Sequence, residues 1–319
     1  MKLPEITAIA KRGPILGRPR FGCLAGSYSL NLTRGCAFSC VYCYARGYPN
    51  APPAGHVYVY RDLPERLASE LDNPRRRSTI GSVALNTASD CFQPLPEILG
   101  VTYRAMEVLL DRRIPFSFLT KGTVPGRFLE LFARGPQLVT GTVCLVCASR
   151  EYRDAYEPGA AAPEERLETL RGLRAAGIRA EVRVDPIIPF VTDREGSIRE
   201  LCGAVVGTGV TTLSLSYLHL RPKVLEILRD ELPEKHLPLV LGAFGADASL
   251  RGELRRTKLL PLPLRKRGYE RFQRIAREYG LTAMVCACKN FDMPGEVCSA
   301  GPIRPAPSRL KRREQLSLF

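Results

Sequence analysis

Strand-like and helix-like segments alternate along residues 29–219 of this 319-residue chain, and this alternation limits the fold more than any other feature. Short apolar runs are separated by amphipathic runs, which is the pattern of consecutive βα units with parallel strands and right-handed crossovers. The expected strands are Ser29–Leu32, Ile80–Asn86, Pro115–Thr120, Leu138–Leu145, Ile178–Asp185 and Thr211–Tyr217.

Helices are expected between these strands, for example at Pro96–Asp111 and Glu164–Ala176. In the second helix, leucines fall three residues apart on one face and charged residues lie opposite, as in a helix that packs on a sheet. Six units are too few to close an eight-stranded barrel. We therefore expect an α/β fold with an open (β/α)6 partial TIM barrel, in which ligands bind at the carboxyl ends of the strands.

Composition divides the chain into four expected parts. Residues 1–28 form an N-terminal extension rich in Gly, Pro and Arg, and residues 29–220 hold the βα units. Residues 221–301 are basic, do not continue the alternation, and contain an expected basic helix at about Lys266–Tyr279. Residues 302–319 begin with a Pro-rich stretch and are expected to form a flexible tail.

The chain is strongly basic, with 47 Lys and Arg against 32 Asp and Glu and a net charge of +15. A field of this size favours a polyanionic partner. Ribosomal RNA, tRNA and DNA are not separable on charge, and a solvated surface in an Arg-rich protein is the alternative explanation.

Nothing near Met1 reads as a signal peptide, and no apolar run approaches the ~18 residues that a membrane span needs. We therefore expect a cytoplasmic protein without a membrane partner. The chain has 11 cysteines, an odd number, and in such a compartment they indicate metal or redox chemistry rather than disulfides.

Three of these cysteines follow the first expected strand, at Cys36, Cys40 and Cys43, with Tyr42 just before the last. Thiolates spaced this closely suit three corners of an iron–sulfur cube, which normally takes four cysteines. An iron without a protein ligand is then open to a small molecule, which favours catalysis over electron transfer. The alternatives are buried thiols or a zinc site, although zinc sites more often show paired Cys-x2-Cys spacings and a fourth ligand.

This cysteine run resembles the signature of radical S-adenosylmethionine (SAM) enzymes. The resemblance implies a [4Fe–4S] cluster whose open iron chelates the amino and carboxylate groups of SAM. It also implies an electron donor, because an electron from the cluster splits the sulfonium and leaves a 5′-deoxyadenosyl radical. The fold that it implies is the same partial barrel.

Polar segments at the expected strand ends extend the resemblance to the branch that includes spore photoproduct lyase and DNA-repair-lyase-like relatives. The segments that carry it, besides the cysteine run, are Thr87–Asp90 with Gln93 and Pro94, Leu119–Lys121, Glu157–Gly159, Glu164–Arg166 and Asp185–Pro189. The lyase takes a hydrogen atom from a cross-linked thymine dimer, which falls back to two thymines. The resemblance therefore implies a DNA-binding, lyase-like repair enzyme.

The same resemblance implies cofactor contacts. Ser89 and Lys121 match SAM-contacting positions, and Tyr42 and Tyr44 flank the cluster. Position alone adds Asp90, Arg183 and Asp185 as weaker candidates. For Arg183 and Asp185 the alternative is an ion pair at the rim of the barrel.

The chain departs from the lyase at the residue that returns the hydrogen atom. The lyase has a cysteine two residues before the matched serine, where this chain has Thr87. Cys91 lies two residues after Ser89 instead. A thiol is a good hydrogen-atom donor, so Cys91 is the candidate catalytic residue; the alternative is a small buried apolar residue.

A second group of cysteines, Cys286, Cys288 and Cys298, is compatible with a second iron–sulfur cluster, or with another metal and a ligand from elsewhere. Cys144 and Cys147 are expected on opposite faces of one strand. Cys23 and Cys202 are expected to serve packing. Among the histidines, only His219 is placed to reach the site.

The C-terminal peptide resembles the short segment by which bacterial replication and repair proteins dock on the DNA polymerase sliding clamp. Gln315 is expected to make polar contacts with the clamp, while Leu316, Leu318 and Phe319 fill apolar pockets. The alternative is a final strand or helical turn packed on the core. Clamp binding favours DNA over RNA.

The sequence thus predicts a cytoplasmic radical SAM enzyme that acts on DNA, at a damaged base or a cross-link. One alternative is a radical SAM enzyme that modifies RNA. Another is an iron–sulfur protein that is tethered to the clamp and senses redox state without turnover.

Overall fold

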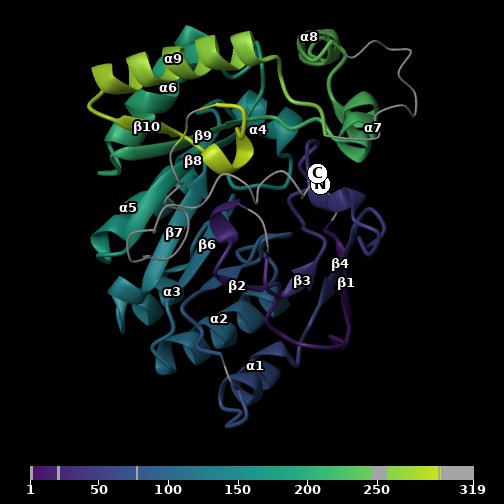
Figure 1. Ribbon diagram of the computed structural model, residues 1–319, viewed down its shortest axis with the longest axis vertical. Helices are drawn as coiled ribbons and strands as arrows, with labels where there is room; N and C mark the ends of the chain where they lie inside the picture. The colour runs from purple at the N-terminus through teal and green to yellow at the C-terminus, as the bar shows by residue number, and fades with distance from the viewer. Residues whose placement is uncertain (1–2, 20–21, 77, 246–256, 294, 296–319) are drawn as a thin grey trace.

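A seven-stranded parallel sheet organises the chain, with strand order β10-β9-β8-β7-β6-β5-β2 (Figure 1). Its strands are β2 Tyr28–Leu30, β5 Val83–Leu85, β6 Phe116–Thr120, β7 Val139–Cys144, β8 Arg179–Ile187, β9 Thr212–Tyr217 and β10 Thr282–Val285. All six expected strands are present. The computed structural model describes all residues except 1–2, 20–21, 77, 246–256, 294 and 296–319, so Cys298 and the clamp-like peptide Gln315–Phe319 lie outside the described residues.

Strand β10 corrects the expectation that the βα alternation ends before residue 221. The basic helix α9 (Leu262–Glu278) is followed directly by β10, which pairs in parallel with β9. This βα unit extends the six predicted strands to seven, and the sheet remains an open partial barrel.

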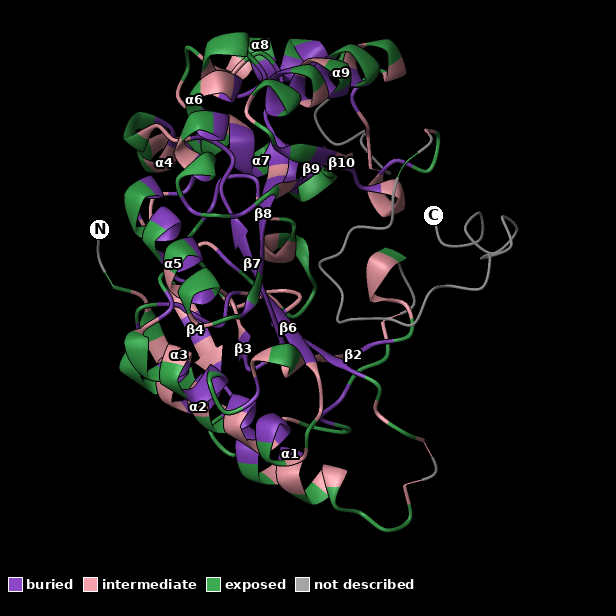
Figure 2. Ribbon diagram, turned by 90° about the vertical axis from the view of Figure 1, so that its left-hand side faces the viewer, coloured by how far each residue is buried: buried purple, intermediate pink, exposed green. Residues whose placement is uncertain are grey.

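Helices cover one face of the sheet, which Figure 2 shows as buried strands beside helices with exposed outer surfaces. The other helices of the described residues are α1 Leu63–Leu71, α2 Pro96–Asp111, α3 Gly126–Phe132, α4 Arg150–Tyr156, α5 Pro163–Ala175, α6 Glu195–Val206, α7 Pro222–Glu231 and α8 Leu237–Ala243. Helix α2 has the predicted bounds, and α5 begins one residue early because Pro163 suits the first helical position. None of the described helices is both long enough and apolar enough to cross a membrane.

Part of the N-terminal extension belongs to a smaller sheet, which the sequence did not predict. Strand β1 (Glu5–Ala8) pairs in parallel with β4 (His56–Val59), and β4 pairs antiparallel with β3 (Thr33–Arg34). Strand β3 leads directly into the cysteine run, so this sheet fixes where the cysteine loop begins.

Aromatic side chains fill the layer between the sheet and α3. Phe118 of β6 lies 4.9 Å from Phe92 and 5.8 Å from Phe132, measured between ring centroids. A side chain at Gly141 would collide with Phe118 and with Leu173 of α5, so the glycine lets α5 approach β7 closely. Burial of these rings supplies hydrophobic stabilisation on the helix side of the sheet.

The inner face of the sheet, away from the helices, is polar. Because Gly141 faces the helices, its neighbours Thr140 and Thr142 face inward. By the same alternation and the strand register, the inner face also carries Ser117, Leu119, Cys144, Glu181, Arg183, Asp185, Ser214 and Ser216. Strands of parallel sheets are normally apolar on both faces, so the polar inner face indicates a binding site.

Candidate active site

The cysteine loop, Cys36–Cys43, is held by the loop that follows β5. The backbone N–H of Ala37 donates to Oε1 of Gln93 at 2.7 Å, and Nε2 of Gln93 donates to the carbonyl of Asp90 at 2.7 Å. The hydroxyl of Thr33 donates to Oγ of Ser89 at 2.8 Å. The predicted SAM-contacting serine therefore lies directly beside the start of the cysteine loop.

Asp90 connects two strand ends. Its Oδ1 accepts from the backbone N–H of Phe92 and from the hydroxyl of Thr120, and its Oδ2 accepts from the backbone N–H of Lys121, each at 2.8 Å. Both carboxylate oxygens are thus occupied by protein donors. The geometry gives Asp90 the role of positioning Lys121 relative to the loop after β5.

Lys121 belongs to a buried ion cluster beneath the cysteine loop. Its Nζ lies 3.3 Å from Oε1 of Glu157, while NH2 of Arg166 lies 2.5 Å from Oε2 of the same carboxylate. The hydroxyl of Tyr42 also donates to Glu157, and Nζ of Lys121 lies 5.5 Å from the centre of the Tyr42 ring. One carboxylate therefore orients two cations and the aromatic residue next to Cys43.

Glu157 stays ionised in this cluster. Burial alone would raise the pKa of its carboxyl, but Arg166, Lys121 and Tyr42 lower the pKa from 4.5 to about 2. Arg166 is held in turn, because its Nε donates to the carbonyl of Ala161 at 2.9 Å and its NH1 to that of Cys144 at 3.0 Å. Glu157 and Arg166 come from the Glu-Pro-Gly and Glu-Glu-Arg segments, whose individual roles the sequence did not reveal.

The cysteine loop has the donor set of a three-cysteine iron–sulfur cluster. Burial and the Glu157 carboxylate raise the pKa of the Cys40 thiol, and the nearby cations Lys121 and Arg166 partly oppose this rise. Thiolates are the iron ligands, and metal binding displaces their protons. Three thiols on one loop beside two cations therefore fit a [4Fe–4S] cluster held by Cys36, Cys40 and Cys43.

Residues that follow β9 contact the segment just after the cysteine loop. The hydroxyl of Tyr44 donates to the carbonyl of Thr87 at 2.7 Å, and the guanidinium of Arg221 lies 5.1 Å from the centre of the Tyr44 ring. A side chain at Gly47 would collide with Lys223 of α7. Tyr44 thus links the cysteine loop to Thr87 in the loop after β5.

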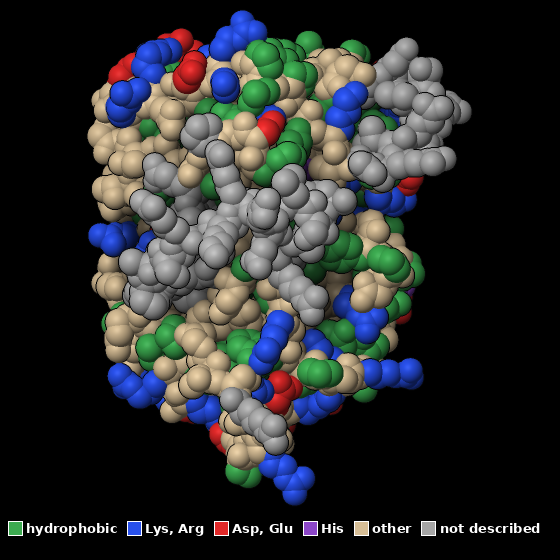
Figure 3. All heavy atoms as spheres, in the orientation of Figure 1, with side chains coloured by type: hydrophobic (Ala, Val, Ile, Leu, Met, Phe, Trp, Pro, Cys, Tyr) green, Lys and Arg blue, Asp and Glu red, His purple; other side chains and the backbone are tan. Residues whose placement is uncertain are grey.

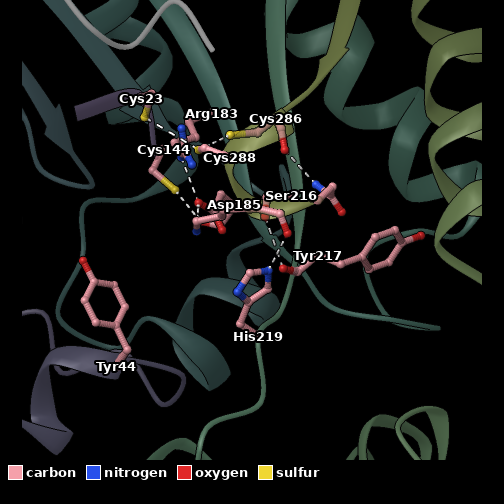
Figure 4. A network of polar contacts seen from close by, with 12 residues as sticks. Cys23, Tyr44, Cys144, Arg183, Asp185, Ser216, Tyr217, His219, Cys286 and Cys288 are labelled. Carbon is pink, nitrogen blue, oxygen red and sulfur yellow. Dashed lines mark hydrogen bonds and ion pairs between the residues drawn. The ribbon is translucent and has the colours of Figure 1, made fainter. Parts of the chain in front are cut away.

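Arg183 and Asp185 form an ion pair at the rim of the barrel (Figure 4), and Lys289 joins it from the C-terminal region. Nε of Arg183 and Nζ of Lys289 lie 2.8 and 2.6 Å from Oδ2 of Asp185. Burial would raise the pKa of Asp185, but the two cations lower it strongly. His219 also reaches this rim, since its Nε2 lies 3.2 Å from the carbonyl of Lys289.

The structure separates two thiols, with Cys91 in the core and Cys144 on the inner face of the sheet. Cys91 has 0% of its surface exposed, and its carbonyl accepts a hydrogen bond from Thr102 on α2. Cys144 lies on the inner face, 2.5 Å from Nζ of Lys121 and 3.0 Å from the carbonyl of Asp185. Strand alternation predicted that Cys144 and Cys147 point to opposite sides, but not which of the two faces the site.

The C-terminal cysteines meet a residue from the N-terminal extension. Sγ of Cys288 lies 2.8 Å from Sγ of Cys286 and 3.8 Å from Sγ of Cys23. The expectation that Cys23 serves packing overlooked this contact, because the two residues are 265 positions apart in the chain. Cys298 lies outside the described residues.

Comparison with known proteins agrees with this geometry. The family model of the radical SAM superfamily matches residues 30–205, which is 176 of the 319 residues. Spore photoproduct lyase complexed with dinucleoside spore photoproduct has a similar structure, with a TM-score of 0.65 and 17% identity over 87% of this chain and 81% of the lyase.

Two curated relatives extend the comparison. An uncharacterized protein of Mycobacterium tuberculosis is 32% identical over 213 residues, which are 64% of this chain and 62% of that protein. The radical SAM Nalpha-GlyT isomerase of Pseudomonas phage M6 is 23% identical over 82% of this chain and 53% of the isomerase. This chain thus spans less than two thirds of the length of either relative.

The cysteine loop follows the first strand of an open βα barrel, and the matched segment contains the loop and the buried ion cluster beneath it. The chain belongs to the radical SAM superfamily, whose members use a [4Fe–4S] cluster and S-adenosylmethionine.

Proposed function

We propose that this radical SAM enzyme acts on nucleic acid, and that its substrate is a damaged or cross-linked base in DNA. One observation carries the proposal: the cysteine loop and Lys121 open onto a polar inner face in the fold of an enzyme that was solved with a dinucleoside photoproduct. The net charge of +15 fits a phosphate backbone. The abundance of thiols fits a reducing cytoplasm.

In this proposal, the residues at the carboxyl ends of the strands bind SAM or position the residues that bind it. The [4Fe–4S] cluster, reduced by an external electron donor, supplies a 5′-deoxyadenosyl radical from SAM. Ser89 and Lys121 contact SAM; Thr33 holds Ser89, and Asp90 and Glu157 hold Lys121. The proposed cofactor contacts also include Tyr42, Tyr44, Arg183 and Asp185.

Cys144 is better placed than Cys91 to return a hydrogen atom. Both thiols are buried, with 1% of Cys144 and 0% of Cys91 exposed, but the sulfur of Cys144 lies on the inner face of the sheet and contacts Lys121, a proposed SAM contact. In the proposed step the S–H bond of Cys144 breaks homolytically and the hydrogen atom bonds to the product radical. The thiyl radical that remains takes one electron and one proton from the external reductant.

Basic side chains support contact with a polyanion. Figure 3 shows Lys and Arg side chains around the edges of the visible face, with fewer Asp and Glu. Part of the charge on α9 is neutralised, since Arg274 pairs with Glu195 and Glu278 at 3.4 and 3.1 Å. Lys266 and Arg267 on the same helix are exposed, and we propose that they contact phosphates.

Anaerobic turnover with defined substrates tests the function. Reconstituted protein, dithionite and SAM are incubated with a dinucleoside spore photoproduct, a lesion-bearing duplex, undamaged duplex or tRNA. We expect 5′-deoxyadenosine and repaired thymine with the lesion substrates. A response to tRNA alone would establish the RNA-modifying alternative, and no 5′-deoxyadenosine with any substrate would favour a binding protein without turnover.

A rearrangement is the second candidate reaction, because the phage relative that covers 82% of this chain is an isomerase. Digestion to nucleosides followed by mass spectrometry separates the two reactions. An isomerised nucleoside keeps the mass of the substrate nucleoside, whereas lesion reversal replaces one cross-linked dinucleoside with two thymidines.

The tail adds a proposed partner, the DNA polymerase sliding clamp, through Gln315, Leu316, Leu318 and Phe319. A pull-down with the clamp compares the full chain with a chain that ends at Glu314. Equal retention of the two proteins contradicts clamp binding and leaves the catalytic proposal intact.

A further inference from the structure

Three sulfur atoms from opposite ends of the chain meet beside the active-site rim (Figure 4). Cys286 follows β10, and Cys288 lies in the 3-10 turn η4 (Ala287–Lys289). Cys23 lies in another turn, η1 (Gly22–Leu24), five residues before β2. The Sγ–Sγ distances are 2.8 Å for Cys286 and Cys288 and 3.8 Å for Cys288 and Cys23.

Glycines permit this close approach. A Cβ at Gly22 would lie 2.7 Å from Cβ of Cys288, and the positive φ of 54° at Gly22 also disfavours other residues. A Cβ at Gly295 would lie 2.9 Å from Cα of Ala287, between the two C-terminal cysteines. The contact between η1 and η4 therefore depends on Gly22, and Gly295 permits close packing against η4 itself.

The turn that carries Cys286 and Cys288 is firmly anchored. Asn290 is buried, and its Nδ2 donates to the carbonyl of Cys286 at 2.9 Å. Its Oδ1 accepts from Tyr269 and Arg265 of α9, each at 3.0 Å. Supporting hydrogen bonds of this kind hold metal ligands in place.

We propose that Cys23, Cys286 and Cys288 supply three of the four ligands of a zinc ion, separate from the iron–sulfur cluster, with a water molecule as the fourth. Zinc–thiolate bonds of about 2.3 Å set tetrahedral sulfur–sulfur distances of about 3.8 Å, which is the separation of Cys288 and Cys23. A cube places each thiolate on a different iron and needs wider spacing. Of the two possibilities left open by the sequence, a second cluster or another metal with a ligand from elsewhere, this geometry favours the single ion.

Loading the site requires one small movement. The 2.8 Å between Cys286 and Cys288 is too short for two ligands of one ion, and among the described side chains no group of three is preset around a metal position. The two sulfurs must separate by about 1 Å to reach the tetrahedral distance, which a side-chain rotation provides.

The zinc ion would link segments next to the two edge strands of the open barrel. Strands β2 and β10 are the two edges of the seven-stranded sheet, and the cysteines flank these edge strands in the sequence. Lys289 follows Cys288 directly, and its ammonium lies 2.6 Å from Asp185 at the rim. The ion therefore fixes the N-terminal extension to the segment that completes the Arg183–Asp185–Lys289 ion cluster.

Metal analysis of full-length protein tests the site without reference to turnover. In the Cys36→Ala/Cys40→Ala/Cys43→Ala variant, which lacks the iron ligands, we expect about one zinc ion per chain. Adding Cys23→Ser, Cys286→Ser or Cys288→Ser should weaken zinc binding at least about tenfold in competition with a chromogenic chelator. Cys202→Ser, at a buried residue of α6, is the matched control and should retain zinc.

A second variant keeps all three thiols and changes only how closely the turns η1 and η4 approach each other. Gly22→Ala should weaken zinc binding because its Cβ separates η1 from η4. Gly13→Ala is the control, since Gly13 has a similar positive φ of 75° but no atom within 4 Å of an added Cβ. Circular dichroism of each variant verifies that the protein is folded.

Three outcomes would overturn the zinc site. The first is zinc binding that Cys23→Ser and Gly22→Ala both leave unchanged. The second is iron rather than zinc in the protein that lacks the three loop cysteines. The third is a metal-free protein whose intact mass reveals a disulfide between Cys286 and Cys288.

Discussion

The ammonium nitrogen of Lys121 lies 2.5 Å from the thiol sulfur of Cys144, and the same sulfur lies 3.0 Å from the carbonyl of Asp185. This contact joins a predicted SAM-contacting residue just after β6 to a thiol at the end of β7. The thiol therefore links Lys121 to Asp185 of the Arg183–Asp185 ion pair.

Replacing Cys144 should separate SAM cleavage from product formation. In Cys144→Ser the hydroxyl still contacts Lys121, so 5′-deoxyadenosine should form at near the wild-type rate. An O–H bond is a poor hydrogen-atom donor, so repaired product should fall at least tenfold relative to 5′-deoxyadenosine. Chromatography of both products measures the ratio.

Cys91→Ser serves as the comparison for Cys144→Ser. Cys91 is buried like Cys144, but its backbone is bound to Thr102 of α2 and its thiol is not the one that contacts Lys121, so we expect its replacement to reduce stability while leaving the product ratio unchanged. The opposite pattern, with uncoupling in Cys91→Ser and none in Cys144→Ser, would restore Cys91 as the hydrogen donor.

The buried carboxylate of Glu157 should make stability depend on acid pH. Its pKa falls from 4.5 to about 2 in the fold, so it stabilises the protein above pH 4.5, and this contribution is lost as pH falls towards 2. The shift corresponds to about 3 kcal/mol. In Glu157→Gln two buried cations lose their partner, which also costs about 3–5 kcal/mol at neutral pH.

Denaturant unfolding at several pH values measures this contribution. The difference in unfolding free energy between wild type and Glu157→Gln should be largest above pH 4.5 and should shrink at lower pH. A difference that stays constant down to pH 3 would show that the fold does not lower the pKa of this carboxyl. Glu164→Gln, at an exposed position on α5, is the control.

Much of the barrel could be predicted from the sequence because its signals are local. Helix α2 has apolar residues at helical spacing and a proline at its first position, and its predicted bounds were correct. Strand β10 was missed because it has only four residues and pairs with β9, some 70 positions earlier. Because β9 is so distant in the chain, no local sequence pattern indicates that β10 pairs with it.

The site was predictable only in part, for the same reason. The three loop cysteines are recognised by spacing, whereas the direction of a loop side chain depends on distant partners. Cys91 points into the core because hydrogen bonds that Thr120 and Lys121 donate to the carboxylate of Asp90 fix the shape of the loop. The contact between Cys23 and Cys288 joins the two ends of the chain, which no sequence period encodes.

A methyl group at Gly122 should disturb the contact between the β6 loop and the cysteine loop. The added Cβ would lie 2.4 Å from the carbonyl oxygen of Phe92 and 3.0 Å from the Phe38 ring. Overpacking of this kind costs about 1–3 kcal/mol. Gly122→Ala should therefore lower the free energy of unfolding by that amount and reduce iron incorporation.

Gly126→Ala is the matched control for Gly122→Ala. Gly126 begins α3, and no atom lies within 4 Å of its added Cβ. Alanine is the better helix former, so stability should be unchanged or should rise by about 0.4–1 kcal/mol. Equal iron content and equal stability in the two variants would argue against the predicted collision.

Gln93 should determine how firmly the cysteine loop holds its cluster. It is fully buried, accepts from Ala37 at 2.7 Å and donates to Asp90 at 2.7 Å. Gln93→Leu leaves the Ala37 N–H without a partner, which costs about 1–3 kcal/mol. Loss of a hydrogen bond that orients metal ligands lowers metal affinity about 10–100-fold. We therefore expect chelators to remove iron from Gln93→Leu correspondingly faster than from wild type.

Gln137→Leu, at an exposed residue between α3 and β7, provides the control for this measurement. It makes the same chemical change where no buried hydrogen bond is lost, so iron release should match wild type. Absorbance of the reconstituted cluster during chelator treatment follows the loss of iron in all three proteins. If Gln93→Leu retains iron as long as Gln137→Leu does, the loop after β5 positions the cysteines without stabilising the bound cluster.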